Sequence, residues 1–128
     1  MTLLEAIAAF EGFGVNPLNR PTRNNNPGNL SFGPFAQSHG AVIEEIPKGY
    51  SSTPRFARFE TVDHGWKALR HLLETRYKGH TVREMVMKYA PPFENDTEFY
   101  IKFICERVGC KPNTVIDDLL TNPKPEEL

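Results

Sequence analysis

The segment RNNNPGNL, residues 23–30, is the most distinctive stretch of this 128-residue chain and does most to narrow its fold. Four of the six residues 24–29 are asparagine, and the Pro27-Gly28 step favours a tight turn, with φ > 0 open to Gly28. Each asparagine amide offers two donors and one acceptor, so such a turn suits a neutral polar ligand such as an amide-bearing sugar. An isolated asparagine usually bonds to its own backbone, but a run of this length favours a binding turn. The substrate-binding residues predicted here are Asn24, Asn25, Asn26 and Asn29.

A short amphipathic helix is predicted upstream of this turn, over residues 3–11. Residues 2–5 have the spacing of a capping box, and the apolar residues that follow share one helical face. Glu11 closes the helix, where the helix macrodipole and the aromatic neighbours Phe10 and Phe13 disfavour its ionised form. A raised pKa is what a general acid needs at neutral pH. A lone glutamate is usually a solvated surface residue. A negative charge at the C-terminal end of a helix is unfavourable with the helix dipole, however, and such local conflicts often occur at functional sites.

The step Phe10-Glu11-Gly12 at the end of an N-terminal helix, followed by a polar turn, resembles the lysozyme-like superfamily. RNNNPGNL, together with YAPPFENDTEFY at residues 89–100, is similar to a group of small phage and prophage peptidoglycan hydrolases. The resemblance implies an α+β, lysozyme-like fold. It also implies cleavage of peptidoglycan strands between N-acetylmuramic acid and N-acetylglucosamine, with Glu11 as the catalytic acid and base.

Two mechanisms for this cleavage differ in the number of carboxylates that they need. A hydrolase of the lysozyme (muramidase) type usually needs a second carboxylate, and the candidates are Glu44, Glu45, Glu60 and Asp63. None of them follows a sheet turn at the short fixed distance that the lysozyme pattern has. By resemblance, a lytic transglycosylase needs one glutamate, which protonates the leaving oxygen and later takes a proton from the sugar's primary hydroxyl.

Further substrate-binding residues are predicted around Glu11: Phe35, Gln37, Tyr89 and Glu94. Phe35 is assigned to stacking against a sugar ring, and Gln37 is expected to line the cleft. Tyr89 and Glu94 are expected to close the cleft from the helical side. The alternatives are that Tyr89 is an aromatic core residue and that Glu94 only caps the next helix.

The remaining pattern predicts an α+β order, mostly helical, with a small three-stranded antiparallel sheet after the first helix. Two strands are expected within residues 30–42 and a third at residues 55–59. Cap and stop signals then predict helices at residues 62–79, 81–89 and 97–108, and a last short helix after residue 114. In the third of these, the residues expected to face inward are Phe99, Phe103, Ile104 and Val108. One domain spanning residues 1–128 is expected, with residues 122–128 as a flexible tail.

Charge and composition narrow the expected partners. With 15 basic and 16 acidic residues and no like-charge run, no nucleic-acid partner is expected. No apolar stretch reaches the ~20 residues that span a bilayer, so no membrane partner is expected. The start of the chain lacks the pattern of a signal peptide, which predicts synthesis in the cytoplasm and phage- or secretion-type delivery to the cell wall in the periplasm. The expected partner is the peptidoglycan glycan strand, and the protein is expected to be a monomer.

The cysteines and histidines carry no metal-binding pattern. Cys105 and Cys110 are five residues apart, and the four histidines form no i, i+4 pair. Both cysteines are interpreted as reduced structural residues. We therefore expect no metal and no other cofactor.

A different class of function stays open from the sequence. The chain could be a non-catalytic glycan-binding or virion structural module that keeps the fold and the polar turn. A secreted antibacterial toxin domain with the same chemistry is a third alternative. Cleavage of a glycosidic bond by the protein would distinguish the catalytic functions from the binding module.

Overall fold

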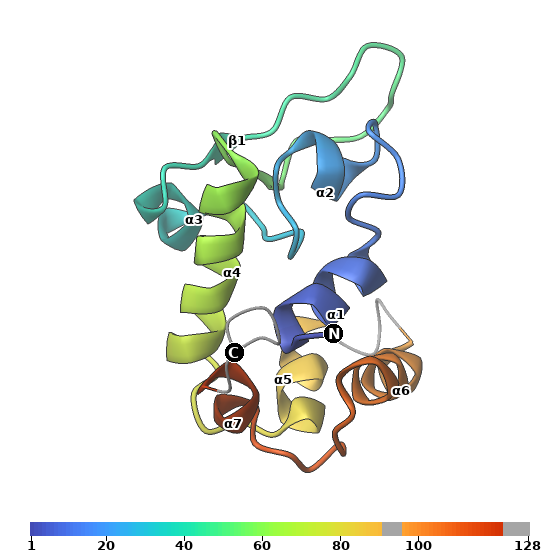
Figure 1. The fold of residues 1–128 in the computed structure, drawn as a ribbon. Helices are drawn as coiled ribbons and strands as arrows, with labels where there is room; N and C mark the ends of the chain where they lie inside the picture. The colour runs from blue at the N-terminus through green and yellow to red at the C-terminus, as the bar shows by residue number, and fades with distance from the viewer. Residues whose placement is uncertain (91–95, 122–128) are drawn as a thin grey trace. The chain divides into compact units, whose positions relative to one another are not determined.

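The computed structural model describes residues 1–90 and 96–121, which belong to two compact units. The helical unit comprises the described parts of residues 1–10 and 70–128, and the turn unit comprises residues 11–69. The boundaries between the units fall within helices α1 (Leu3–Glu11) and α4 (Val62–Thr75), which Figure 1 labels. None of the described helices is long and apolar enough to cross a membrane. A single domain over residues 1–128 stays a prediction.

The helical unit is built from the helices that the cap and stop signals predict. Besides parts of α1 and α4 it contains α5 (Val82–Tyr89), α6 (Thr97–Val108) and α7 (Ile116–Thr121). The capping box of α5 is confirmed, because Thr81 Oγ1 accepts from the Glu84 amide at 3.1 Å and the Thr81 amide donates to Glu84 Oε1 at 2.8 Å. Gly109 ends α6 in the left-handed region with φ +80°. Residues 91–95, which were expected to end α5 and to open α6, lie outside the described residues.

Helix α1 has the predicted bounds and the predicted cap. The Glu5 amide donates to Thr2 Oγ1 at 3.2 Å, and the Thr2 amide donates to Glu5 Oε1 at 2.9 Å. The largest buried side chains of the helical unit then form its core: Leu3, Ile7, Leu73, Val82, Met85, Tyr100, Ile101, Ile104 and Ile116. Phe10 adds to this core by stacking on Tyr100 with ring centroids 3.7 Å apart.

One inward-facing prediction for α6 is wrong. Phe99 is 56% exposed, whereas Tyr100, Ile101 and Ile104 are buried. The buried stripe is centred on residues 100–104, so the helical period carries Phe99 to its edge. There it still lies 6.0 Å from the Phe10 ring, and Phe103 is half-buried.

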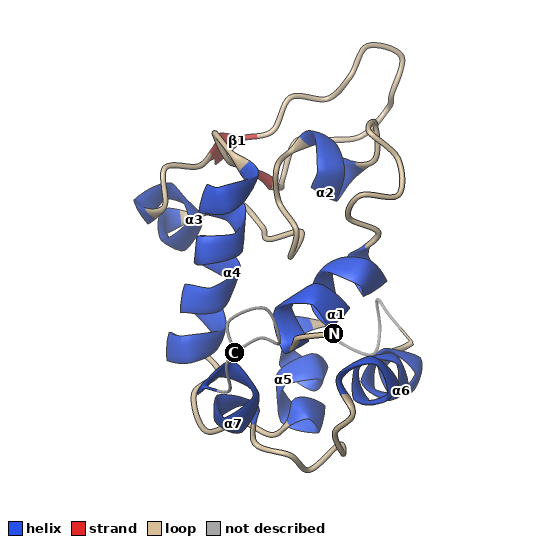
Figure 2. Cartoon of the chain, viewed as in Figure 1, coloured by secondary structure: helices blue, strands red, loops and turns tan. Residues whose placement is uncertain are grey.

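The turn unit contains less strand than predicted. Strand β1 (Val42–Ile43) pairs antiparallel with β2 (Ala57–Arg58), with Val42 opposite Arg58 and Ile43 opposite Ala57. The strand predicted at residues 55–59 corresponds to β2, whereas of the two strands predicted within residues 30–42 only Val42 enters a strand and Ser31 forms an isolated bridge to Phe56. The sheet is therefore two-stranded and small, as the few red segments in Figure 2 show. Helical content with a small antiparallel sheet fits the predicted α+β class.

Two short helices of the turn unit were not predicted. Where two strands were expected, α3 (Pro34–Ser38) forms instead, because a proline at the first helical position is already set to a helical φ. Helix α2 (Arg20–Arg23) is capped by Asn19, whose side chain accepts a hydrogen bond from the Thr22 amide at 3.3 Å. It also has a proline in its first turn. In the sequence, the pattern Asn19-x-Pro21 was the signal that could have predicted α2.

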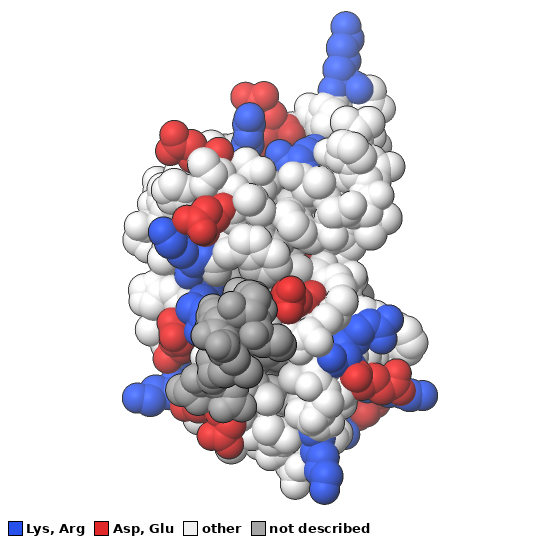
Figure 3. All heavy atoms as spheres, in the orientation of Figure 1, with Lys and Arg blue, Asp and Glu red and all other residues white. Residues whose placement is uncertain are grey.

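Charged side chains of both signs are interspersed on the face drawn in Figure 3. That distribution agrees with the formal net charge of −1. Among the described residues, no group of three or more His, Cys, Asp or Glu side chains is arranged to hold a metal ion. Cys105 and Cys110 are free thiols, and burial together with the neighbouring Cys105 raises the pKa of Cys110 to about 12.

Candidate functional site

Glu11 is the last residue of α1 and is half-buried. Gly12 follows it with φ +87°, a conformation that L side chains rarely adopt. Asn19 Nδ2 donates to the Gly12 carbonyl at 2.7 Å, and the Gly14 amide donates to Thr22 Oγ1 at 2.8 Å. The segment that follows Glu11 is therefore fastened to the cap and first turn of α2.

Helix α2 leads directly into the asparagine-rich turn, where Asn26 is fully buried. Asn26 Nδ2 donates to the carbonyls of Leu30 at 3.0 Å and Ala57 at 2.9 Å, and its Oδ1 accepts from the Leu30 amide at 2.9 Å. Both amide hydrogens and the oxygen are used, so Asn26 holds the turn against β2. The alternative considered from the sequence, asparagines that bond to the backbone, describes this residue.

Asn24 and Asn25 also bond within the turn unit. Asn24 is 1% exposed, and its Nδ2 donates to Glu44 Oε1 at 3.1 Å. Asn25 Nδ2 donates to the Phe59 carbonyl at 3.0 Å and more weakly to that of Glu60 at 3.3 Å. These contacts give both side chains a structural role, and binding of substrate by them stays a prediction.

The left-handed positions of the turn fall on asparagines, not on Gly28. Asn25 has φ +52° and Asn29 has φ +50°, and asparagine tolerates this region better than most residues. Asn29 differs from the other three, because its Oδ1 is buried and has no hydrogen-bond partner among the described residues. The burial of this oxygen also shields it from a ligand.

Glu44, a candidate second carboxylate, is a buried structural anchor with a side chain that is 0% exposed. Its two oxygens accept hydrogen bonds from three side chains and two backbone amides: the Nε and Nη2 of Arg20 at 2.7–3.0 Å, Arg23 Nη2 at 3.5 Å, Asn24 Nδ2 at 3.1 Å, and the amides of Arg55 and Phe56 at 3.0 Å each. Burial acts to raise the pKa of Glu44, but these donors outweigh it and lower the pKa to about 2. A carboxylate this fully bonded has no free oxygen for a sugar or a water, so it holds α2 and the turn together.

The other candidate carboxylates are exposed. Asp63 pairs with Lys67 at 3.0 Å on α4, and Glu60 lies at the surface. Glu45 lies in the loop after β1, where it lines an open pocket with Arg23 and other residues. Nothing in these environments prepares any of the three as a nucleophile.

Gly65 is a site-supporting residue that the sequence analysis missed. It is buried in α4 and faces the turn so closely that an added Cβ would lie 2.1 Å from the Asn25 carbonyl oxygen and 2.7 Å from Pro27 Cδ. Only glycine permits this approach of helix and turn. The available signal was a glycine inside the helical pattern of residues 62–75.

The remaining predicted residues lie on other elements. Phe35 and Gln37 are on α3, where Phe35 is half-buried with its ring 5.1 Å from that of His39 and Gln37 is exposed. Tyr89 ends α5 in the helical unit, half-buried, with its ring 6.2 Å from that of Tyr77. Glu94 lies outside the described residues. The turn unit therefore contains Glu11, the asparagine turn, Phe35 and Gln37.

The fold and the site define a small α+β protein whose polar turn is anchored by a buried carboxylate, and no protein-family model matches the chain. It is similar to Protein P5 of Pseudoalteromonas phage PM2, with 33% identity over 107 residues. The alignment covers 81% of this chain and 64% of Protein P5, so the chain spans less than two thirds of that relative's length. The similarity links the chain to bacteriophages.

Proposed function

We propose that the protein has a lysozyme-like fold and cleaves peptidoglycan glycan strands between N-acetylmuramic acid and N-acetylglucosamine, with Glu11 as general acid and then base. The observation that carries the proposal is the continuous path from Glu11 to the turn. Glu11 ends α1, Gly12 is bonded to Asn19, and Asn19 caps the helix that leads into residues 24–29. A half-buried carboxylate is thereby fixed within the same unit as a polar turn. The bacteriophage relative agrees with an enzyme delivered to a bacterial cell wall by a phage or a secretion machine.

The lytic transglycosylase form of this reaction is favoured, because it needs one carboxylate. The protonated Glu11 carboxyl gives its proton to the glycosidic oxygen as the bond to C1 of the muramic acid breaks. The Glu11 carboxylate then takes the proton of the muramic acid's primary hydroxyl, whose oxygen bonds to C1 and closes the anhydro ring. The N-acetyl group of the substrate assists by stabilising C1. Glu44 is unsuited to act as the second carboxylate of a hydrolase, because its oxygens are occupied by five donor groups.

Substrate contacts within this proposal come from the turn unit. The substrate contact assigned to Asn29 stays a prediction, because its unpartnered Oδ1 is buried. Phe35 and Gln37 of α3 supply an aromatic face and an exposed amide. Asn24, Asn25 and Asn26 support these contacts by holding the turn, and roles for Tyr89 and Glu94 stay predictions.

A second candidate is a non-catalytic glycan-binding or virion structural module. The observation that favours it is that the Glu44 oxygens are fully hydrogen-bonded, together with the exposure of Glu45, Glu60 and Asp63. Such a module would bind glycan strands and release them intact.

Product analysis on purified peptidoglycan tests both candidates. Wild type, Glu11→Gln and the matched control Glu60→Gln, which changes an exposed carboxylate of the same unit, are incubated with sacculi, and soluble products are identified by mass spectrometry. We expect anhydro-muropeptides from wild type and Glu60→Gln and none from Glu11→Gln. Reducing ends in place of anhydro products would select the lysozyme type. Equal release by wild type and Glu11→Gln would overturn the assignment of Glu11, and intact strands that nevertheless bind would select the module.

A further inference from the structure

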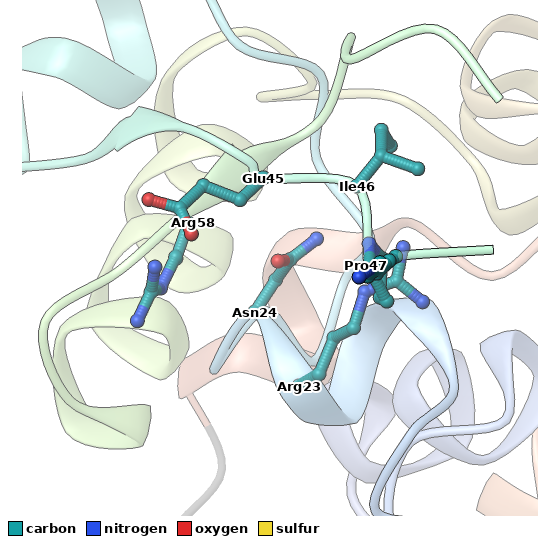
Figure 4. A pocket seen from close by; sticks show the side chains of 7 residues that line it. Arg23, Asn24, Glu45, Ile46, Pro47 and Arg58 are labelled. Atoms are coloured by element: carbon teal, nitrogen blue, oxygen red, sulfur yellow. The ribbon is translucent and has the colours of Figure 1, made fainter. Parts of the chain in front are cut away.

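An open pocket of about 340 Å³ lies in the turn unit, beside the end of α2 and the start of the turn. Arg23 and Asn24 lie on one side of it, residues 45–48 on another, and Arg58 of β2 completes the lining. In Figure 4 the side chains of Arg23 and Asn24 extend from α2 and the start of the turn toward residues 45–48. The lining therefore combines three cationic side chains with one carboxylate, that of Glu45.

The positive charges of this pocket are only partly neutralised within the turn unit. Arg20 makes the short, forked contacts to Glu44 at 2.7–3.0 Å, whereas Arg23 reaches that carboxylate only at 3.5 Å. Arg23 Nε is buried and lacks a hydrogen-bond acceptor among the described residues. One carboxylate thus faces two guanidinium groups, and Arg20 takes most of its hydrogen-bonding capacity.

The other charged groups of the lining make no ion pairs with the described residues. Arg58 and Lys48 are exposed cations, and the Glu45 carboxylate is exposed as well. With Arg23 they leave a net excess of two positive charges around the pocket. A concave surface with an excess of one sign concentrates ligands of the opposite sign.

Two of the side chains that line the pocket are held by hydrogen bonds within the turn unit. Arg23 Nη1 donates to the Leu18 carbonyl at 2.9 Å, and Asn24 is held by Glu44 at 3.1 Å. A guanidinium group held in place loses little conformational freedom when it binds an oxyanion, and its planar fork matches a carboxylate. Ile46 and Pro47 add an apolar wall beside these donors.

We propose that this pocket binds the free carboxylate of a peptide stem attached to the glycan strand. This inference rests on the proposed function, which supplies peptidoglycan as the ligand. The lining favours a carboxylate carried on a short peptide over free phosphate, because the Ile46-Pro47 wall suits the aliphatic part of the peptide. Free phosphate shares the oxyanion chemistry and is the competing source.

The test is a titration of the full chain carrying Glu11→Gln, followed by amide chemical shifts in NMR. The probes are muramyl dipeptide with a free carboxylate, the same compound with that carboxylate amidated, and inorganic phosphate. We expect the free carboxylate to shift the amides of Glu45, Ile46, Lys48 and Arg58, and the amidated compound to leave them unchanged. In an Arg58→Gln variant we expect affinity to fall about tenfold, as loss of a charge-assisted hydrogen bond implies. The matched control Lys67→Gln, which removes an exposed cation outside the pocket, is expected to leave it unchanged.

Three results would overturn the inference: equal binding of the amidated compound, no effect of Arg58→Gln, or phosphate that binds more tightly than the dipeptide. Backbone shifts of the free variants establish that each is folded before titration. The outcome is independent of catalysis, because binding is read in a Glu11→Gln background. If the carboxylate binds but wild type does not cleave glycan strands, the binding proposal for the pocket stands and the proposed enzymatic function is wrong. If wild type cleaves glycan strands but the carboxylate does not bind, the enzymatic function stands and the binding proposal is wrong.

Discussion

The helical unit and the turn unit are each stabilised internally by a different kind of interaction. Buried side chains of the helical unit are mostly large and apolar, with Leu3, Ile7 and Tyr100 among the most enclosed. The buried hydrophobic residues of the turn unit are four alanines with only three larger side chains: Leu30, Phe59 and Leu69. It compensates with buried polar groups, since Asn24, Asn26 and Glu44 are each no more than 2% exposed. A region with little apolar volume can hold a defined shape when most of its buried polar groups are hydrogen-bonded to one another.

The largest expected effect comes from removing the central charge of the turn unit. Glu44→Gln leaves Arg20 and Arg23 without their carboxylate, and breaking a buried pair in this way costs about 3–5 kcal/mol. Denaturant unfolding followed by amide hydrogen exchange should show the loss concentrated in residues 11–69. The matched control is Glu98→Gln in the helical unit, where the ion pair with Arg83 is exposed and is worth at most about 1 kcal/mol. Similar losses in the two variants would contradict the contrast between the units.

Acid should reproduce this loss without a mutation. The pKa of Glu44 is lowered from 4.5 to about 2, so its stabilising contribution is complete above pH 4.5 and is lost as the pH falls toward 2. The shift corresponds to about 3 kcal/mol at full protonation. Unfolding free energies of wild type and Glu44→Gln, measured between pH 7 and pH 2, should therefore converge below pH 4.5. A constant difference over that range would show that Glu44 does not titrate as its contacts imply.

An intermediate effect is expected at the close approach of α4 to the turn. Alanine normally stabilises a helix interior relative to glycine, but the Cβ of Gly65→Ala would lie 2.1 Å from the Asn25 carbonyl oxygen. Relief of that overlap should cost about 1–3 kcal/mol. Gly33→Ala is the control, because its backbone is extended and no atom lies within 4 Å of the added Cβ. Thermal unfolding of both variants measures the effect, and an unchanged Gly65→Ala would rule out the tight contact.

The smallest effect is expected for a local feature of the helical unit. Thr81→Ala removes the side-chain half of the α5 capping box and should cost about 1 kcal/mol. The control Thr75→Ala removes a hydroxyl that bonds only to the His71 carbonyl one turn earlier on α4, and it should change stability by less. If Thr81→Ala destabilised the protein as much as Glu44→Gln, local caps would matter as much as the buried polar network.

The same contrast explains what could be predicted from the sequence. Capping boxes at Thr2 and Thr81 and the glycine stop at Gly109 involve partners within a few residues, so their helices were confirmed. In the turn unit, Arg55 and Phe56 donate to a carboxylate at least eleven residues away, and Asn26 bonds to Ala57, 31 residues away. No local pattern reveals those partners. The two strands predicted within residues 30–42 did not form as predicted for a different, local reason. The alternation of apolar and polar residues was weak there, and Pro34 favoured a helical turn.

The sequence by itself determined that residues 23–30 form a polar turn, that Glu11 ends a helix and that most of the second half is helical, because each depends on neighbours along the chain. Only the tertiary structure decided that Glu44 anchors this turn, that Gly65 must remain small and that the Asn29 side chain has a buried, unpartnered oxygen. Burial and hydrogen-bond satisfaction depend on which distant residues meet. Composition therefore identified the polar groups, and the fold decided which of them remain available to a ligand.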